Sequence, residues 1–458
     1  MPMFEKVLVA NRGAVAARVL RALDALGVAS VAVYSDADRD APYLEMAGQT
    51  MRIGEAAARD SYLNQDALLD AMRRCGADAL HPGYGFLSEN AAFAGRVQEA
   101  GACFVGPSPR WIDAMGHKTR ARALAAEHGL PVGRGSSVLG GDPEAMLRAA
   151  EEIGYPVLVK PAAGGGGIGM LPARSRSELP GAVERATSMA QRGFSNGEVY
   201  LERLIERPRH IEFQLLGDRY GGVAHLFERD CSVQRRHQKI IEEAPAPGIE
   251  RREIDALAAR VAAVMQRLGY DNIGTVEMLR GADGAFSFLE MNTRLQVEHG
   301  VTEEVTGIDL VAAQLRAAAG DRLAGILPAC LGLRGHAIQA RVYAEDPKRF
   351  FPSPGTLTVF RPPRDPSVRI ETGYREGQTV TPHYDPLLAK VIVRADTRAQ
   401  AIDRLIDALR DFAIEGVKHN IPALLGILRF DAFRAGAVHT GLVAEMLAGG
   451  SSLSPQHA

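Results

Sequence analysis

The sequence predicts a globular chain of about three domains that combines α/β and α+β architecture. At ~150 residues per domain, the length of 458 residues corresponds to about three domains. Hydrophobic residues make up 46% of the chain and charged residues 24%, which is typical of globular proteins and excludes a disordered or collagen-like chain. In addition, alternating strands and helices open the chain, whereas strands joined by turns dominate its middle.

The first predicted domain, residues 1–117, begins as a doubly wound α/β sheet. The apolar run Lys6–Ala10 predicts a buried strand, Asn11–Gly13 a turn, and the amphipathic pattern of Val15–Leu26 a helix. A second strand is predicted at Val31–Tyr34. The loop after the first strand is where such sheets bind ligands, but this turn lacks the glycine spacing of a dinucleotide site.

Two further domains are predicted at residues 118–330 and 331–445, followed by a flexible tail at residues 446–458. In the second domain the patterns predict helices at 119–128 and 143–153 and strands at 156–160, 209–216, 222–228, 273–279 and 285–290. In the third domain they predict strands at 337–344, 357–360 and 387–393 and a helix at 397–412. The middle domain is therefore expected to be mixed or antiparallel α+β, without repeated βαβ crossovers.

Charge and cysteine content exclude several classes of protein. The chain has 53 Lys and Arg against 55 Asp and Glu, so a dominant surface for nucleic acid or anionic membranes is not expected. Four cysteines without a CxxC pair indicate neither a disulfide framework nor a zinc site. No stretch long enough to cross a membrane is free of charge, and the first residues lack the pattern of a signal peptide. We therefore expect a cytoplasmic protein with reduced, buried thiols.

A run of glycines, Gly164–Gly167, follows a predicted strand that ends at Lys160. Glycines let the backbone close on a ligand and present N–H groups to phosphate oxygens. A formal GxGxxG match is weak evidence for a dinucleotide site, because Leu171 and Pro172 follow where a helix would begin. A mobile lid over phosphates, hinged at Lys160, fits the pattern better, and a flexible surface loop is the alternative.

Two glutamates are predicted to face each other across a β-hairpin. The dipeptide Asp283–Gly284, the strongest short hairpin signal, lies between two predicted strands. A two-residue turn there pairs Glu277 with Glu290, with Cβ atoms ~4.5–5.5 Å apart. Asn292 would share their face, and such oxygen ligands suit Mg²⁺ or Mn²⁺. A longer turn would shift the register and leave exposed surface glutamates instead.

Cationic and polar side chains gather near this hairpin in the sequence. The stretch Asn292–His299 places Arg294 and Glu298 in a short irregular segment, where a guanidinium binds planar oxyanions and a carboxylate accepts a proton. His210 lies on the polar face of a predicted strand. The segment Cys231–Lys239 has more donors than a simple surface loop and lacks the aromatic residues of a nucleic-acid patch. A pocket for phosphates and a small anion is the economical interpretation; a solvated turn and a structural histidine are the alternatives.

Together these segments resemble the ATP-grasp superfamily and, within it, biotin carboxylase, over nearly the whole chain. The motifs that carry the resemblance are Ala10–Gly13, His81–Asn90, the glycine run, Glu228–Ser232, His237–Lys239, Glu242–Pro247, Glu290–His299, Arg341–Asp346, Phe351–Gly355 and Tyr384–Pro386. The resemblance implies a pre-ATP-grasp domain at 1–117, an ATP-grasp domain at 118–330 with a lid at about 132–204, and a C-terminal biotin carboxylase domain at 331–445.

The resemblance also implies roles for individual residues. ATP would contact Lys118, Lys160, Gly166, Gly167, Glu202, Arg203, Leu204, Ile205, His210, Gln234, His237, Glu277, Leu279 and Glu290. Two Mg²⁺ or Mn²⁺ ions would be held by Glu277, Glu290 and Asn292. Bicarbonate would be bound by Lys239, Arg294, Gln296 and Val297. Glu298 would be the base, with Arg294 and Lys239 as further catalytic residues, and biotin would contact Arg341 and Tyr84.

In such enzymes ATP phosphorylates bicarbonate, and the carboxyphosphate breaks down to CO₂ and phosphate. Phosphate then removes the ureido proton of biotin, and the biotin enolate attacks CO₂. The chain contains no Met-Lys-Met attachment sequence for biotin. The resemblance therefore implies a homodimeric ligase that carboxylates a separate biotin carboxyl carrier protein, with a carboxyltransferase subunit in trans. It would perform the first half-reaction of an acyl-CoA carboxylase, such as the acetyl-CoA carboxylase of fatty acid metabolism.

Three positions depart from the family pattern. Ile168 stands where Arg or Lys is usual, Gly300 where Pro is usual, and Pro161 where a small residue is usual. Ile168 removes one phosphate contact, so altered ATP affinity or rate is expected, with function retained. Two alternatives stay open: another ATP-grasp ligase that forms an acyl phosphate, and a nucleotide-sensing scaffold that binds a carrier without turnover.

Overall fold

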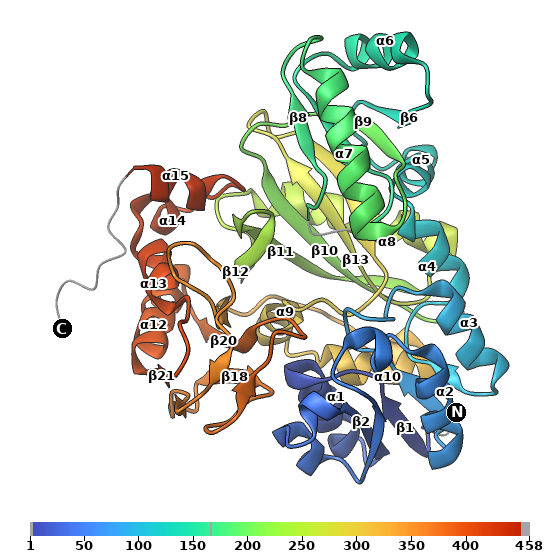
Figure 1. The fold of residues 1–458 in the computed structure, drawn as a ribbon, viewed down its shortest axis with the longest axis vertical. Helices are drawn as coiled ribbons and strands as arrows, with labels where there is room; N and C mark the ends of the chain where they lie inside the picture. Colours follow the sequence, from blue (N-terminus) through green and yellow to red (C-terminus); the bar gives the residue numbers. More distant parts are fainter. Residues whose placement is uncertain (1–2, 165–166, 450–458) are drawn as a thin grey trace.

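The N-terminal region of the computed structural model, which describes residues 3–164 and 167–449, is a parallel sheet covered by helices (Figure 1). Five strands lie in the order β3-β2-β1-β4-β5. They are β1 (Lys6–Val9), β2 (Ala29–Ser35), β3 (Gln49–Gly54), β4 (Ala79–His81) and β5 (Cys103–Phe104). The helices are α1 (Gly13–Ala25), α2 (Gln65–Cys75), α3 (Ala91–Glu99) and α4 (Pro109–Gly116). The predicted doubly wound α/β start is confirmed.

A smaller four-stranded sheet forms the lid, in green at the top of Figure 1, in the order β6-β9-β7-β8. Its elements are β6 (Gly135–Val138), α6 (Pro143–Ile153), β7 (Val157–Pro161), β8 (Leu171–Ala173), α7 (Leu179–Phe194) and β9 (Val199–Arg203). Val157, Val159, Leu179 and Leu201 belong to a core of its own. Helix α5 (Lys118–Glu127) precedes the lid, and the glycine run joins β7 to β8. Gly166, predicted to contact ATP, lies outside the described residues.

The largest sheet has eight strands and joins two of the predicted domains. Its order is β14-β13-β10-β11-β12-β15-β20-β18, and the pairs are antiparallel. The strands are β10 (Arg209–Gly217), β11 (Val223–Arg235), β12 (Gln238–Ala244), β13 (Asn272–Arg280), β14 (Phe286–Asn292), β15 (His336–Tyr343), β18 (Val368–Thr372) and β20 (Leu387–Ala395). Because β12 pairs with β15, the sheet runs without interruption across the boundary predicted at residues 330 and 331.

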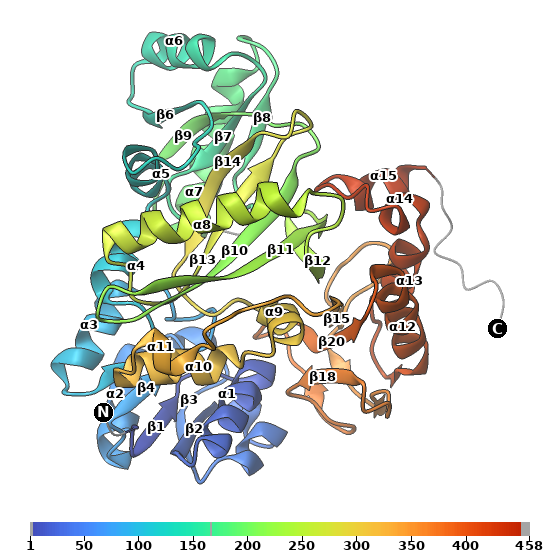
Figure 2. The same cartoon turned by 180° about the vertical axis from the view of Figure 1, so that it is seen from behind.

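Helices cover this sheet and complete the C-terminal region (Figure 2). They are α8 (Arg251–Leu268), α9 (His299–Thr306), α10 (Leu310–Ala319), α11 (Leu323–Ile326), α12 (Arg398–Asp411), α13 (Ile421–Arg429), α14 (Asp431–Arg434) and α15 (Leu442–Ala448). Two short strand pairs complete the region: β16 (Gly355–Thr356) with β19 (Thr379–Val380), and β17 (Val359–Arg361) with β21 (Ala413–Glu415). Of the single strand predicted at 357–360, residues 359 and 360 lie in β17, whereas residues 357 and 358 lie between β16 and β17. Helix α15 reaches into the predicted tail at 446–458, whose remainder from residue 450 lies outside the described residues.

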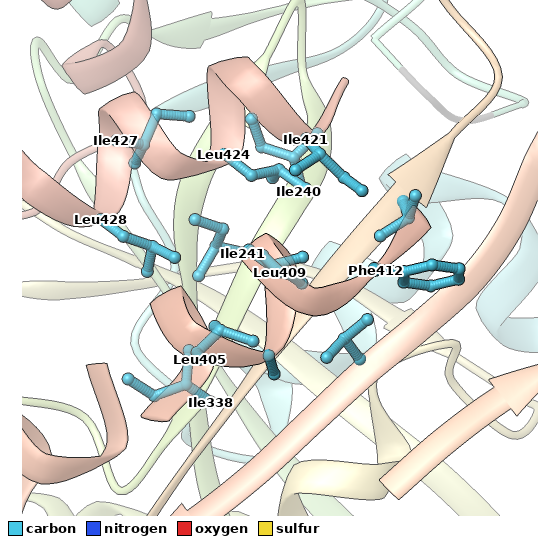
Figure 3. Packing of buried hydrophobic residues seen from close by; sticks show 14 of the residues in the cluster. Ile240, Ile241, Ile338, Leu405, Leu409, Phe412, Ile421, Leu424, Ile427 and Leu428 are labelled. Carbon is cyan, nitrogen blue, oxygen red and sulfur yellow. The ribbon is translucent and has the colours of Figure 1, made fainter. Parts of the chain in front are cut away.

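Strand β12 is anchored in the core of the C-terminal region. Figure 3 shows Ile240 and Ile241 of β12 among the side chains of α12 and α13, including Leu405 and Leu424, and all four are buried. Full burial of one such side chain contributes ~1.5–3 kcal/mol. This packing fixes the strand that carries Lys239, one of the predicted catalytic residues.

Two smaller findings concern the cysteines and the possibility of membrane-spanning helices. The cysteines are free, and Cys75 and Cys231 are buried, Cys103 is half-buried and Cys330 is exposed. The prediction of buried thiols is thus wrong for Cys330. Among the helices of the described ranges, none combines the length and apolar character needed to cross a membrane.

Candidate active site

The β13–β14 hairpin places Glu277 opposite Glu290, as the sequence predicts, but through a different turn. The Gly281 N–H donates to the Ala285 carbonyl at 2.9 Å, so the loop is one residue longer than predicted and ends at Gly284, with φ +82°. A β-bulge just after Glu277 shifts the register back by one residue. The two irregularities cancel, so the predicted pair survives although the predicted two-residue turn is wrong.

A second hairpin replaces the donor-rich loop expected at residues 231–239. Strand β11 continues to Arg235, beyond the end predicted at residue 228, and β12 begins at Gln238. Arg236 and His237 form the turn, with φ +47° and +66°, the left-handed backbone of a type I′ hairpin turn. The sequence gives little sign of it because neither turn residue is Gly or Asn. The hairpin holds His237 and Lys239 in the wall of a cavity.

The cavity, of about 1160 Å³, lies between the N-terminal sheet, the lid, the large sheet and the C-terminal region. It exceeds the ~300–1,000 Å³ of typical ligand pockets, so it has room for a nucleotide and a second substrate. The described residues that the sequence analysis proposed all line it: Tyr84, Lys118, Lys160, Gly167, Glu202, Arg203, Leu204, Ile205, His210, Gln234, His237, Lys239, Glu277, Leu279, Glu290, Asn292, Arg294, Gln296, Val297, Glu298 and Arg341.

Lys239 lines this cavity and is surrounded by carboxylates. Its Nζ donates to Glu212 at 2.6 Å, to Glu277 at 2.8 Å and to Glu298 at 2.6 Å. Burial opposes the charge, but these three carboxylates outweigh it and raise the pKa of Lys239 well above its usual value. The side chain is therefore a fixed cation that an incoming anion can share.

Glu298 is fully buried between two cations. It accepts from Lys239 at 2.6 Å and from Arg341 Nη2 at 2.9 Å. Burial favours the neutral acid, but Lys239, Arg341 and Arg229 outweigh it and hold the pKa of Glu298 well below its usual range. The carboxylate is thus ionised in the absence of substrate and able to accept a proton.

A buried polar network is joined to Lys239 through Glu212, and the sequence analysis did not predict it. Arg229, with no exposed surface, donates to Glu212 at 2.5 Å and to Gln214 and Thr302 at 2.8 Å. Glu212 and Gln214 share the face of β10 that carries His210, so the alternation of that strand was a usable signal. Arg229 is the direct cross-strand partner of Glu212, and this pairing was not readable because the strand predicted from the sequence ended at residue 228.

The predicted metal ligands, Glu277, Glu290 and Asn292, all line the cavity and offer oxygen atoms to a metal ion. Asn292 Nδ2 donates to Glu277 at 2.9 Å, Glu277 lies 2.8 Å from His210 Nε2, and Glu290 lies 2.7 Å from Lys118 Nζ. Burial opposes ionisation of Glu277, but Lys239 and His210 lower its pKa well below the usual value. Two carboxyl groups and an amide on one face fit Mg²⁺ or Mn²⁺, which prefer hard oxygen ligands.

Arg294 is held by acceptors on several sides. Its Nε donates to Glu89 at 2.7 Å, and its terminal nitrogens donate to Gln296 at 3.0 Å and to Asn292 at 2.8 Å. Glu89, from the loop before α3, was not among the predicted site residues. The guanidinium is thereby oriented before any ligand arrives, which reduces the entropy lost on binding an oxyanion.

The lid contributes a buried lysine to the cavity. Lys160 Nζ donates to Glu202 at 3.0 Å, and the same carboxylate accepts from the Tyr200 hydroxyl at 2.7 Å and lies 3.0 Å from Arg122. Burial lowers the pKa of Lys160, and Glu202 opposes this. Glu202 is thus the hydrogen-bond partner that fixes Lys160, the lysine expected at the ATP phosphates.

Gly167, the last glycine of the run, approaches the turn of the β11–β12 hairpin closely. A Cβ atom on Gly167 would lie 2.6 Å from the Cβ of His237, and its φ of +73° also disfavours any side chain. Lys118 connects the same region to the metal ligands, since its Nζ donates to the Gly164 carbonyl and lies 2.7 Å from Glu290. By contrast, the departure Ile168 is 49% exposed, so its side chain does not reach the cavity.

Residues from two ends of the chain complete the cavity. Thr440 lines the cavity, as Leu204 and Leu279 do, and its N–H donates to the Pro208 carbonyl at 2.9 Å. Asn11 lines it too, and its side chain donates to the carbonyls of Pro82 at 2.7 Å and Tyr84 at 2.9 Å. Asn11 and Thr440 were not predicted as site residues.

Comparison with known proteins identifies the class to which this arrangement belongs. Family models match as follows: biotin carboxylase, N-terminal domain, at residues 3–112; carbamoyl-phosphate synthase L chain, ATP binding domain, at residues 117–326; and biotin carboxylase C-terminal domain at residues 339–445. The lid, the large sheet and the cation-rich cavity are thus those of an ATP-grasp enzyme.

Individual relatives agree over the whole length. Biotin carboxylase 2 of Bacillus subtilis is 49% identical over 448 residues, 97% of this chain and 100% of that protein. The pyruvate carboxylase subunit from Methanothermobacter thermautotrophicus is 44% identical, over 97% of this chain and 90% of that protein. The biotin carboxylase domain dimer of Hydrogenobacter thermophilus 2-oxoglutarate carboxylase, in complex with MgADP, ADP and bicarbonate, matches with a TM-score of 0.95 and 41% identity over 100% of both chains.

The chain belongs to the biotin carboxylase family. It is an ATP-dependent ligase that carboxylates biotin.

Proposed function

We propose that this enzyme activates bicarbonate with ATP in the cavity and transfers the carboxyl group to biotin on a separate carrier protein. The observation that carries the proposal is the meeting of Lys239, Glu298 and Arg341 at 2.6–2.9 Å, beside the oriented guanidinium of Arg294. This cluster has the cations for a small planar anion and the base for its proton.

ATP is placed at the lid side of the cavity. Lys118 and Lys160 supply charge to the phosphates, and the glycine run closes over them. Leu204, Ile205 and Leu279 give the apolar surface for the adenine, while Gln234 and His237 face the ribose and phosphates from the β11–β12 hairpin. Glu277, Glu290 and Asn292 would hold Mg²⁺ or Mn²⁺, and the ion neutralises phosphate charge during transfer.

Bicarbonate is placed between Lys239 and Arg294, against Gln296 and the backbone of Val297. An anion at this position shares the positive charge of Lys239 and Arg341 with Glu298, and this raises the basicity of the carboxylate. Glu298 then accepts the proton of bicarbonate as the oxygen attacks the terminal phosphorus of ATP, with ADP as the leaving group. Fixed cations around the attacking oxygen stabilise the charge that develops there.

Biotin is placed on the side of Tyr84 and Arg341. Carboxyphosphate breaks down to CO₂ and phosphate, and phosphate takes the ureido proton. Arg294 stabilises the biotin enolate while the ureido nitrogen of biotin forms the bond to CO₂. A closed lid keeps water from carboxyphosphate, which would otherwise be hydrolysed.

The partners follow from this chemistry and from the relatives. We propose a biotin carboxyl carrier protein and a carboxyltransferase subunit in trans, with an acyl-CoA as the final acceptor. The match to a structure described as a dimer supports a homodimer. One relative is a subunit of a pyruvate carboxylase and another is a domain of a 2-oxoglutarate carboxylase, so 2-oxo acids are the competing class of acceptor. The cytoplasmic location stays a prediction.

One assay tests the central proposal. ATP hydrolysis is measured with Mg²⁺, with and without bicarbonate and free biotin. We expect turnover that requires bicarbonate and increases with biotin. Turnover indifferent to both would indicate another ATP-grasp ligase, and ATP binding without turnover would indicate a scaffold.

A further inference from the structure

Two buried groups hold the proposed bicarbonate-binding loop from outside the cavity. Lys390 of β20 has no exposed surface, and its Nζ donates to the Val297 carbonyl oxygen at 3.0 Å. His299, the first residue of α9, is equally buried, and its Nδ1 lies 2.7 Å from the Gln296 carbonyl oxygen. Neither side chain lines the cavity, whereas Gln296 and Val297 both do.

The two groups fix successive peptide units by different chemistry. Burial lowers the pKa of His299 well below its usual value, and the charge of Lys390 adds to this. The ring is therefore neutral, and its Nδ1 must carry the hydrogen because a carbonyl oxygen only accepts. Lys390 supplies the one cation of the pair, and its bond to Val297 is charge-assisted.

Lys390 also belongs to a row of charged side chains across three strands. It pairs directly with Arg341 of β15 on one side and with Glu371 of β18 on the other. Directly opposed residues share a face, so the row leads from a cation of the site through Lys390 to Glu371, which is also buried. Arg341 in turn contacts Glu298 at 2.9 Å. Lys390 is thus linked to the bicarbonate-binding loop in two ways: directly, through the Val297 carbonyl, and indirectly, through its cross-strand partner Arg341, which contacts Glu298.

We propose that Lys390 is a positioning residue for bicarbonate: its ammonium fixes the peptide plane of Val297 so that the backbone and the adjoining side chains of Gln296 and Glu298 meet the anion together. This inference rests on the proposed function. It assigns Lys390 no contact with substrate, since the side chain does not line the cavity.

The surroundings make this support sensitive to pH. The charged or titratable groups near Lys390 are Arg341, Glu371, Arg369, His299, Glu303 and Arg18. Burial lowers the pKa of Lys390 to about 8, with Glu371 and Glu303 opposing and Arg369 and Arg18 reinforcing the shift. A neutral amine makes a weaker hydrogen bond than an ammonium, so the loop loosens as pH rises through this value. Lys239, with a pKa raised well above its usual value, keeps its charge there.

The test separates bicarbonate binding from ATP binding in the assay of bicarbonate-dependent hydrolysis. Lys390→Met is expected to raise the KM for bicarbonate about tenfold, since it removes a charge-assisted hydrogen bond, and to leave the KM for ATP unchanged. In the wild type the KM for bicarbonate should rise from about pH 7 to about pH 9, and in Lys390→Met it should be independent of pH. Lys390→Arg, which keeps its charge throughout, should restore a low KM and abolish the rise.

Lys418→Met is the matched control, because Lys418 is exposed and pairs with Asp346 away from the cavity. Equal changes in both KM values, or an unchanged KM for bicarbonate in Lys390→Met, would overturn the positioning role. If Lys390→Met fails to fold, the wild-type pH profile and Lys390→Arg decide, and a wild-type KM for bicarbonate that is flat with pH refutes the inference. A wild type without bicarbonate-dependent turnover would overturn the proposed function itself, a result distinct from these.

Discussion

Replacing Glu298 by Gln removes the proposed base and keeps its volume. In the structure the carboxylate is fully buried and accepts from Lys239 and Arg341. An amide retains one acceptor oxygen but cannot take up the proton of bicarbonate. We therefore expect Glu298→Gln to bind ATP and to lose bicarbonate-dependent hydrolysis.

The structure allows the two effects of this change to be scaled. Loss of a general base costs ~10²–10⁴ in rate. The loss in stability is smaller, because Lys239 keeps Glu212 and Glu277 as partners and Arg341 keeps Glu242 at 2.5 Å. No cation is left without a carboxylate, so we expect ~1–3 kcal/mol, below the ~3–5 kcal/mol typical of an orphaned buried charge.

The assay compares kcat for bicarbonate-dependent ATP hydrolysis with the free energy of unfolding in urea. Glu345→Gln is the matched control, because Glu345 is also buried and paired with an arginine, Arg235, but does not line the cavity. It should retain turnover. A wild-type kcat in Glu298→Gln would refute the role of base, and a rate loss no larger than that of Glu345→Gln would reduce Glu298 to a structural ion-pair partner.

Three further outcomes follow from particular contacts. Glu290→Gln should raise the Mg²⁺ concentration for half-maximal turnover by about tenfold or more, and an unchanged Mg²⁺ titration would contradict the metal role. Gly167→Ala should lower both kcat and the melting temperature, because its φ of +73° disfavours a side chain and its Cβ would meet His237 at 2.6 Å; Gly181→Ala in α7, whose nearest atom is 3.6 Å away, is the control, and equal rates would contradict the close approach. Burial opposes ionisation of Glu371, but Lys390, Arg369 and Arg21 lower its pKa from 4.5 to about 2, so its stabilisation is complete above pH 4.5 and lost towards pH 2. Urea unfolding midpoints should therefore fall over this range, and less so in Glu371→Gln.

The hairpin of the metal ligands shows how far local sequence reasoning extends. Asp283–Gly284 correctly indicated a turn, because left-handed backbone at Gly284 is a local property. The extra loop residue and the compensating bulge after Glu277 were not readable, since a bulge forms where packing on both faces requires a particular register. The pairing of Glu277 with Glu290 was right, but the turn inferred for it was wrong.

The buried ionic groups show the opposite limit. Arg229 and Glu212 lie in separate strands, and Lys390 lies far from Val297 in the chain. Nothing in their local sequence says which carboxylate or carbonyl each cation will meet. The register of β10 with β11 joins the first pair, and the packing of the segment between β14 and α9 against β20 joins the second.

The sequence by itself determined the doubly wound start, the antiparallel middle, the glycine-rich lid and the chemical types of the site residues. These depend on periodicity, turn chemistry and motifs, which are local in the chain. The tertiary structure alone decided the continuity of β12 with β15 and the convergence of three carboxylates on Lys239. It also set the direction of each pKa shift, because burial and charge act through space and depend on neighbours that are distant in the sequence.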